Sequence, residues 1–562
     1  MRDETFGNTG GEIKNYEIDN LGLVAAAFDE FELESLINSD IGKVGSHVVV
    51  DSGALVKLLV MQMLNVPYQS LSGTEEYYEN RPVGAFLNQD ISSEHLGRAV
   101  LARLLDTMHE YGGQNLFLEC SERIVKKLGV KIKEVHIDSS SFHYDGKQRI
   151  EEGCDLELKL GYSRDHRPEL IQAIMLMLAD GQSKLPVYSQ NLSGNIQDKS
   201  SFAEVVRTGI PILKEQYREL KYLVGDSALC TAASFKATEN KDYFLVTRVP
   251  DTHGQVKSCM AETKKEELVP IFPDDPKSPL GKWVDDFDID GVKVKALLVN
   301  NEELRGQKEK TVKKHAQKEL ERLTSKLKKL RTQPLSTKAD AEKQVNKIIA
   351  RAKLCTVSDV CYEEVTKNAN KGRPRGNQPK EVKVVGVKVT ANVEIDEERL
   401  EQRIQEEIKY VLVTNDVKRD WTMAELITVY KRNSVIERNW KCLKNPKFFV
   451  DALYLQKPSR IDALLWIMSI ALLVYTAMEY KIRQSMKEHN QAIPSIVKGR
   501  IEEQPTLMRM LQYIANQHIS LVKLPNDTLY ICNMSPQLKK ILIALGPTWC
   551  RYFNSTYYEG KI

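Results

Sequence analysis

Three carboxylates stand where the surrounding sequence could bring them together. Asp138 ends the stretch KIKEVHID, Asp226 ends KYLVGD, and Glu437 lies within ITVYKRNSVIERNWKCLKNP, residues 427–446. Carboxylate oxygens are the ligands that Mg²⁺ and Mn²⁺ prefer. Two such ions about 4 Å apart can activate a water or a 3′-hydroxyl and stabilise the leaving oxygen of a phosphodiester. A lone aspartate at a strand end is usually a turn or a helix cap, so this chemistry requires a fold that places all three together.

The segment that carries Glu437 is predicted to be a helix with an unusually polar face. Tyr430, Glu437 and Lys444 are seven residues apart, and seven residues return to within about 20° of one direction around a helix. Asn433 and Lys441 fall on the same stripe. A packed helix would place Leu and Ile there, so we expect this face to serve a functional site.

The elements that would position the carboxylates follow one another as strand, strand, strand, helix, strand, helix, strand. KIKEVHIDSSSFHY alternates like a strand, and the apolar runs ELIQAIMLMLAD, LPVYSQNLSGN, KYLVGDSAL and DYFLVTRV follow, with two helical stretches between them. This is the order of the ribonuclease H-like fold, whose first and fourth strands are neighbours. Because ligands of α/β sheets sit at the carboxyl ends of strands, Asp138 and Asp226 should lie side by side, facing the helix of Glu437. Bound metal ions would also offset the repulsion between three carboxylates.

A long insert separates the last strand of this set from the helix of Glu437. It contains further strand patterns and a charged helical pair, residues 305–354, whose two apolar stripes indicate an antiparallel hairpin. The first arm of the hairpin is strongly basic, which fits either a solvated face or a DNA contact. We therefore predict an α/β protein: a ribonuclease H-like catalytic domain interrupted by a β-rich insert with a helical hairpin, and preceded by an all-α N-terminal module.

The predicted domains follow from these changes of pattern. The N-terminal helical module could be a packing domain or a reader of DNA ends, and we expect DNA binding. The full division is a polar leader (1–20), the helical N-terminal domain (21–128), the catalytic domain (129–250 and 427–485), the insertion domain (251–426) and a C-terminal helical region (486–562).

Composition sets outer bounds on the class of protein. The chain has 562 residues, of which 42% are hydrophobic and 28% charged, as in ordinary soluble proteins, and its net charge of +3 argues neither for nor against nucleic acid. Nine scattered cysteines without a CxxC pair suggest neither zinc nor disulfides. The apolar run 463–478 is shorter than the roughly 20 residues of a bilayer span. We expect a cytoplasmic protein in which this run is a buried helix.

Several segments taken together resemble the DDE transposases of bacterial insertion sequences, in the branch with a β-rich insert before the glutamate and a Tyr-Arg-Glu-Lys signature around it. VHIDSSSFHYDG is similar to the first-aspartate segment, LVGDSALCTAASF to the second and VYKRNSVIERNWKCLK to the glutamate segment. GYSRDHRPELIQ, NLSGNIQDKSSF and KPSRIDALLWIMSIALLVYTAMEYKIR also resemble this branch, and the resemblance spans residues 20–555. Only the combination of motifs is specific.

The resemblance implies a role for each residue of the polar stripe. Asp138, Asp226 and Glu437 would be the catalytic residues and the ligands of two Mg²⁺ or Mn²⁺ ions. The DNA-binding residues would be Tyr430, Lys441 and Lys444, which hold phosphates and bases of the transposon end, together with Asn433. One position departs from the signature: Asn433 stands where an arginine is expected, and Arg432 is displaced by about 100° around the predicted helix.

Two further groups of residues carry weaker signals. In NANKGRPRGNQPK, residues 368–380, the Arg373-Pro374-Arg375 core resembles an AT-hook, which can lie in a narrow A·T minor groove. A solvated linker explains this loop equally well. His136, His143 and His166 lie near the first aspartate or in the following loop, but isolated histidines are more often structural, and their spacing does not suggest zinc.

The sequence thus predicts a DNA transposase that binds the terminal inverted repeats of its element, cleaves the DNA ends and joins them to target DNA. Its partners would be double-stranded DNA and a second copy in a homodimeric synaptic complex, with no membrane, in the bacterial cytoplasm near the nucleoid. The alternatives are a metal-dependent nuclease of the same fold and a domesticated DNA-binding protein that has lost catalysis. The intact acidic triad argues against the latter.

Overall fold

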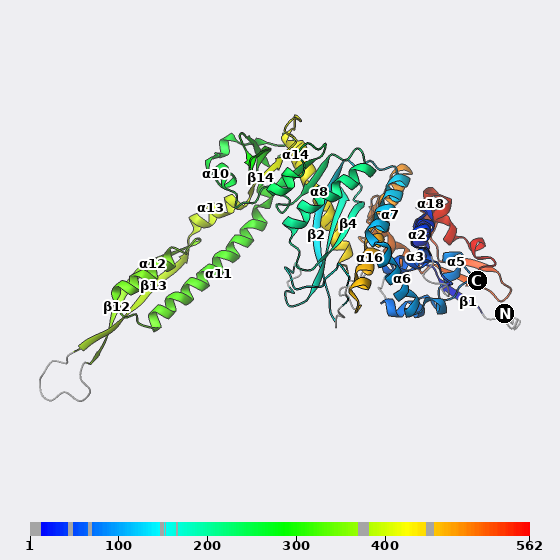
Figure 1. Cartoon of the computed structure of the whole chain (residues 1–562), viewed down its shortest axis with the longest axis horizontal. Coiled ribbons are helices and arrows are strands. Elements are labelled where there is room, and N and C mark those ends of the chain that lie inside the picture. The colour runs from blue at the N-terminus through cyan, green and yellow to red at the C-terminus, as the bar shows by residue number, and fades with distance from the viewer. Residues whose placement is uncertain are drawn as a thin grey trace.

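The computed structural model describes residues 13–42, 49–65, 70–146, 151, 153–163, 167–368, 382–445 and 455–562. The chain forms an elongated molecule with a helical body at one end, a large sheet in the middle and a projecting arm at the other end (Figure 1). The α/β class predicted from the sequence is confirmed by this mixed sheet and its helices.

The central sheet has nine strands in the order β4-β3-β2-β5-β6-β14-β11-β8-β7. Its first half comprises β2 (Glu134–His143), β3 (Gln172–Asp180), β4 (Pro186–Ser193), β5 (Tyr222–Gly225) and β6 (Phe244–Arg248). Strands β2, β3 and β4 pair antiparallel, whereas β5 runs parallel to both β2 and β6. Strands β2 and β5, the first and fourth of the predicted set, are therefore neighbours, as the sequence order indicated. The residues of β3 are all buried, which explains its continuous apolar run.

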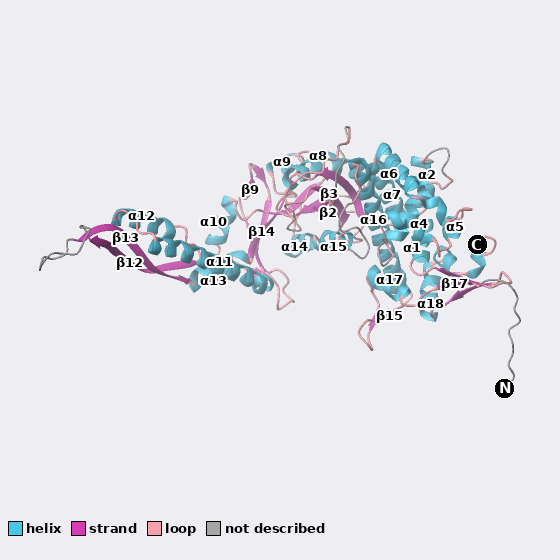
Figure 2. Cartoon of the chain, turned by 90° about the horizontal axis from the view of Figure 1, so that it is seen from below, coloured by secondary structure: helices cyan, strands magenta, loops and turns pink. Residues whose placement is uncertain are grey.

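The other half of the sheet comes from the segment interpreted as an insert. It consists of β14 (Lys409–Thr414), β11 (Lys295–Asn300), β8 (Leu280–Val284) and β7 (Val269–Pro270). Strand β14 pairs antiparallel with β6 and with β11, so these strands extend the central sheet and do not form a sheet of their own. Helices α8 (Asp198–Gln216) and α9 (Ala232–Lys236) cover one face of the first half, and α14 (Met423–Lys431) and α15 (Ser434–Leu443) lie on the other (Figure 2).

The arm is built from a helical pair and a long two-stranded ribbon. Its elements are α11 (Arg305–Thr332), α12 (Lys338–Ile349), β12 (Cys355–Asn368), β13 (Val382–Ile395) and α13 (Glu397–Glu407). The predicted hairpin is present, and its leucine stripe packs largely on the ribbon: Leu323, Leu327 and Ile348 form one buried cluster with Cys355. The opposite face of α11 carries the basic residues and is exposed, because only one side of the helix is apolar.

The helical body surrounds the longest helix of the protein, α16 (Pro458–Glu488), which packs against the N-terminal helices and β4. The N-terminal helices are α1 (Leu21–Glu30), α2 (Leu33–Ile41), α3 (Ser52–Met63), α4 (Thr74–Tyr78), α5 (Val83–Leu87), α6 (Arg98–Tyr111) and α7 (Gly113–Leu128). By length and composition α16 could cross a membrane, but 94% of its most apolar window is buried inside the protein. It is the buried core helix that the apolar run predicted.

The secondary structure near the two ends of the chain differs from what the sequence predicted. Strand β1 (Lys14–Glu17) lies within the supposed polar leader and pairs with β17 (Ser520–Lys523), which in turn pairs with β18 (Leu529–Cys532). The C-terminal region also contains α17 (Leu507–Ala515) and α18 (Pro536–Leu545), so it is mixed and not purely helical. Strands of four residues that pair across the whole chain carry too little local pattern to be recognised.

Candidate active site

Two of the three predicted catalytic carboxylates lie side by side at the edge of the parallel strands. In the register of β2 and β5, Ile137 pairs with Gly225, and the next residue along each strand is Asp138 or Asp226. Neighbouring strands lie about 4.8 Å apart, so the two backbones deliver their carboxylates to one place. Asp138 is half-buried and Asp226 is exposed. The two aspartates therefore stand on neighbouring strands, as the order of elements in the sequence predicted.

Short-range hydrogen bonds orient both aspartates. One carboxylate oxygen of Asp138 accepts a 2.8 Å hydrogen bond from the backbone N–H of Ser139. A carboxylate oxygen of Asp226 accepts one of 2.9 Å from the N–H of Ala228, and its carbonyl accepts a 2.6 Å bond from the hydroxyl of Thr247 on β6. The bond from Thr247 holds the turn after β5 against β6, the next strand of the sheet.

The helix predicted over 427–446 is in fact two short helices, which corrects the sequence-based interpretation. Helix α14 starts with a capping box, in which the side chain of Thr422 and that of Glu425 each bond to the other's backbone N–H. The chain then tightens: Asn433 donates its N–H to the carbonyl of Tyr430, and Val435 donates to Arg432. These bonds span three residues instead of four, so the break between α14 and α15 rotates the second half of the polar stripe.

Arg432 and Asn433, at this break, both point at strand β2. A guanidinium nitrogen of Arg432 lies 2.7 Å from a carboxylate oxygen of Glu134. The Asn433 side-chain oxygen lies 3.3 Å from Nδ1 of His136, which is fully buried. Arg432, which the sequence placed about 100° around the helix from the polar stripe, thus makes a defined contact with β2. Asn433 makes the neutral contact that its side chain allows, with a neighbouring side chain.

Glu134 is the acceptor around which this junction is organised. Burial alone would raise the pKa of Glu134, but His136 and Arg432, which lie 3.6 and 2.7 Å from its carboxylate, hold it below its ordinary value. The carboxylate is therefore charged and anchors the start of α15 on β2, four residues before Asp138. The strand-like alternation of KIKEVHID did not single out Glu134, because it gave no sign of which helix would cover it.

Tyr430, on α14, has a hydroxyl whose pKa responds to its surroundings. Burial raises this pKa to about 12, and the cation of Arg248 works in the opposite direction. The negative charges of Asp226 and Glu437 both add to the increase. Tyr430 is consequently a neutral donor at physiological pH. Arg248, at the end of β6, is a residue of this site that the sequence analysis missed, although its place at a strand end was a usable signal.

The remaining residues of the stripe lie along α15. Glu437 and Lys441 are exposed on this helix, which packs against β2 and β3. Lys444 directly follows the helix, half-buried, with its ammonium 5.7 Å from the centre of the Phe142 ring. Arg373, Arg375 and the whole AT-hook-like core lie outside the described residues, as does His166.

The sequence implies a divalent metal ion, which would need oxygen atoms of several side chains as ligands. Within the described part of the chain, no group of three or more His, Cys, Asp or Glu side chains is arranged to hold a metal ion. Asp138, Asp226 and Glu437 nevertheless offer oxygen donors alone, the set that suits Mg²⁺ or Mn²⁺. The residues present fit such an ion by type.

Comparisons with known proteins identify the family of this chain. The family described as "Transposase DDE domain" matches residues 131–474, more than half of the chain, and a domain of unknown function, DUF4277, matches residues 13–122. No curated protein matches the chain. It is similar to the piggyBac transposase synaptic complex with hairpin DNA at 10% identity and a TM-score of 0.37, covering 95% of this chain and 88% of that one. The Mos1 transposase paired-end complex with left transposon end is similar at 13% identity and a TM-score of 0.14, covering 35% and 59%.

Proposed function

We propose that this chain, which belongs to the transposase DDE domain family, binds the terminal inverted repeats of its element, cleaves the DNA ends and joins them to target DNA. Besides the family, the observation that carries the proposal is the pairing of Ile137 with Gly225, which puts Asp138, inside β2, next to Asp226, directly after β5. Helix α15, which carries Glu437, packs against β2 and β3.

Asp138, Asp226 and Glu437 would be the catalytic residues and would hold two Mg²⁺ or Mn²⁺ ions. Bound ions would supply an activated water or 3′-hydroxyl and charge stabilisation for the leaving oxygen of the phosphodiester. Glu437 would have to turn its side chain toward the aspartates, which its exposure on α15 permits. The protein's own part would be to hold the three carboxylates and to position the DNA beside them.

The other residues of the site would bind the DNA. Tyr430 keeps its proton, since its pKa is raised to about 12, so it can donate a hydrogen bond to a phosphate oxygen. Lys441 and Lys444 would supply positive charge, as most DNA affinity comes from such contacts to phosphate. Asn433 would act mainly through His136, and Arg373 with Arg375 would add affinity from their loop.

The wider organisation is proposed in the same terms. Strands β2 to β6 with α14, α15 and α16 would form a ribonuclease H-like catalytic domain, and residues 21–128 a DNA-binding domain. Two copies would form a homodimeric synaptic complex, because joining two ends to one target needs two active sites. The protein would act in the bacterial cytoplasm, on nucleoid DNA. A metal-dependent nuclease of the same fold would cleave without joining ends to target.

Replacement of Asp226 by alanine tests the function directly. We expect cleavage of DNA that carries the sequences flanking this reading frame to be abolished, and end binding to be largely retained, because binding depends on Lys and Arg. Asp242→Ala is a matched control, since Asp242 is an exposed aspartate that pairs with Lys214 far from α15. A variant Asp226→Ala that cleaves at a near-normal rate would contradict the triad. A strand-transfer assay with the same ends separates a transposase from a nuclease.

A further inference from the structure

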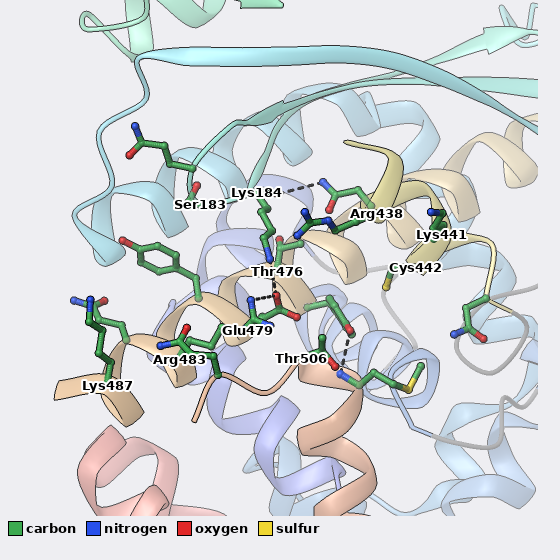
Figure 3. A pocket seen from close by; sticks show the side chains of 18 residues that line it. Ser183, Lys184, Arg438, Lys441, Cys442, Thr476, Glu479, Arg483, Lys487 and Thr506 are labelled. Carbon is green, nitrogen blue, oxygen red and sulfur yellow. Dashed lines mark hydrogen bonds and ion pairs between the residues drawn. The ribbon is translucent and has the colours of Figure 1, made fainter. Parts of the chain in front are cut away.

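A cavity of about 700 Å³ lies beside the candidate active site, on the flank of α15. It is bounded by α15, the turn between β3 and β4, the second half of α16 and the segment that leads into α17 (Figure 3). The residues of α15 that line the cavity include Arg438, which directly follows Glu437 in the sequence, and Lys441. A ligand that fills it would therefore be close to the catalytic helix.

The lining of the cavity is strongly basic. Its charged residues are five cations, Lys184, Arg438, Lys441, Arg483 and Lys487, and one carboxylate, Glu479. The net charge of the wall is thus four positive charges, in a chain whose total is only +3. Cations gathered around one hollow repel each other unless an anion occupies it, so the wall indicates an anionic ligand with several charges.

The single carboxylate does not neutralise the hollow, because its bonds are already used in the wall. Glu479 is 3.0 Å from the ammonium of Lys184 and 2.8 Å from the guanidinium of Arg483, and it accepts a 2.9 Å bond from the N–H of Leu507. Its side chain is only 13% exposed. Glu479 therefore holds two of the cations in place.

The other three cations are available to a ligand. Arg438, Lys441 and Lys487 are exposed, and no carboxylate of the described residues lies within ion-pair distance of any of them. Arg438 can bind a phosphate through two nitrogens, whereas the two lysines act as point charges. This arrangement suits an elongated polyanion better than one small ion.

The wall is held rigid by contacts between its elements. The side chain of Asn439 on α15 donates a 3.1 Å hydrogen bond to the carbonyl of Lys184 in the β3–β4 turn. Lys184 itself has a left-handed backbone, with φ of 69°, a conformation that costs energy for a residue other than glycine. The N–H of Met508 donates to the hydroxyl of Tyr475, which ties the entry of α17 to α16. Lys184 and Arg483 are thus held in place, and the exposed Arg438, Lys441 and Lys487 project from a fixed backbone.

We propose that this cavity binds the phosphodiester backbone of the DNA end, a few nucleotides from the bond that is cleaved. The proposal rests on the proposed function, because it takes the DNA at Glu437 as given. Lys441 lies four residues, or about 6 Å, further along α15 than Glu437. A strand whose scissile phosphate meets the carboxylates therefore reaches the cations of the cavity as it continues along the helix.

The salt dependence of DNA binding tests the proposal. We expect the double variant Arg438→Ala/Lys487→Ala to bind a fluorescent duplex of mixed sequence more weakly, with the slope of log K against log salt reduced by about 1.8, or about 0.9 for each lost phosphate contact. Both side chains are exposed, so the thermal unfolding of the variant should match that of the wild type. Arg438→Lys combined with Lys487→Ala should reduce the slope by only about 0.9, since it keeps the charge at position 438.

The control is Lys257→Ala/Lys277→Ala, which removes two exposed lysines that line no part of the cavity. It should leave the slope unchanged. If the cavity variant keeps the wild-type slope while the wild-type protein cleaves its ends, this inference is wrong and the proposed function stands. If the slope is unchanged but self-association is lost, the cavity binds an acidic segment of a second copy, which also overturns it. Failure of the wild type to bind or cleave any DNA end would refute both proposals.

Discussion

Replacing Arg432 by alanine should loosen helix α15 from strand β2. The guanidinium lies 2.7 Å from Glu134, whose side chain is 7% exposed, whereas Arg432 itself is 34% exposed. A hydrogen bond to a charged group contributes roughly 1.5–3 kcal/mol, and partial exposure of the arginine places the contact in the lower part of that range. We expect the packing of α15 on β2 to lose about 1.5–2 kcal/mol of stability. Among the described residues, Glu134 then keeps one side-chain partner within ion-pair distance, His136, at 3.6 Å.

Hydrogen exchange of the α15 amides, followed by mass spectrometry, measures this loss where it occurs. A chain of this size does not unfold in one step, so local opening is a better observable than a single melting temperature. The expected change is an exchange rate roughly 10- to 30-fold faster in α15, since about 1.4 kcal/mol corresponds to a factor of ten. End cleavage should fall as well, more than DNA binding does, because Glu437 loses its position.

The contribution of the Arg432–Glu134 contact to stability should depend on pH in a defined direction. The pKa of Glu134 is lowered from 4.5 in the folded protein, so its stabilising contribution is complete above pH 4.5 and is lost as the pH falls through the lowered value. The difference between Arg432→Ala and the wild type should therefore shrink on acidification below pH 4.5. Arg207→Ala, which breaks an exposed ion pair with Glu204, is the control and should leave exchange in α15 unchanged. Equal α15 exchange in Arg432→Ala and the wild type would refute the anchoring role.

Two further predictions concern the DNA-binding residues. Lys444→Ala should reduce cleavage of a pre-cut end more than Asn433→Ala, since a charge-assisted contact contributes roughly 1.5–3 kcal/mol and a neutral one about 1 kcal/mol; the reverse order would show a specific role for Asn433. Changing Arg373 and Arg375 together to alanine should weaken binding to A·T-rich ends and lower the salt slope by about one to two phosphate contacts. An unchanged salt titration would leave that loop as a linker.

The placement of the two aspartates could be predicted because it depends on local pattern and strand order alone. The apolar runs before Asp138 and Asp226 could be recognised as strands, and their neighbouring positions follow from the order of elements, although β2 continues past Asp138 to His143 and only β5 ends directly before its aspartate. The extension of the sheet by β14 and β11 could not be predicted in the same way. Those strands are equally apolar, and nothing in them indicates that β14 pairs with β6 instead of forming a separate sheet.

The helix break at Arg432 could not be predicted because the sequence on both sides favours one continuous helix. No proline or glycine stands there, and the polar stripe of Tyr430 and Glu437 has the period of an unbroken helix. The break follows from tertiary contacts with a strand about 300 residues away along the chain. Glu134 accepts a hydrogen bond from Arg432, and the ring of His136 contacts the side-chain oxygen of Asn433.

These contacts also explain the departure from the Tyr-Arg-Glu-Lys signature. An arginine at the position of Asn433 would bring a cation against the buried His136, whereas the neutral amide of asparagine is compatible with an imidazole at 3.3 Å. The cation stands one residue earlier, in Arg432, where it neutralises the buried Glu134. An arginine committed to Glu134 is not available to phosphate. Under the proposed function, the DNA-binding charge would then come from residues further along the chain, which are Arg438, Lys441 and Lys444.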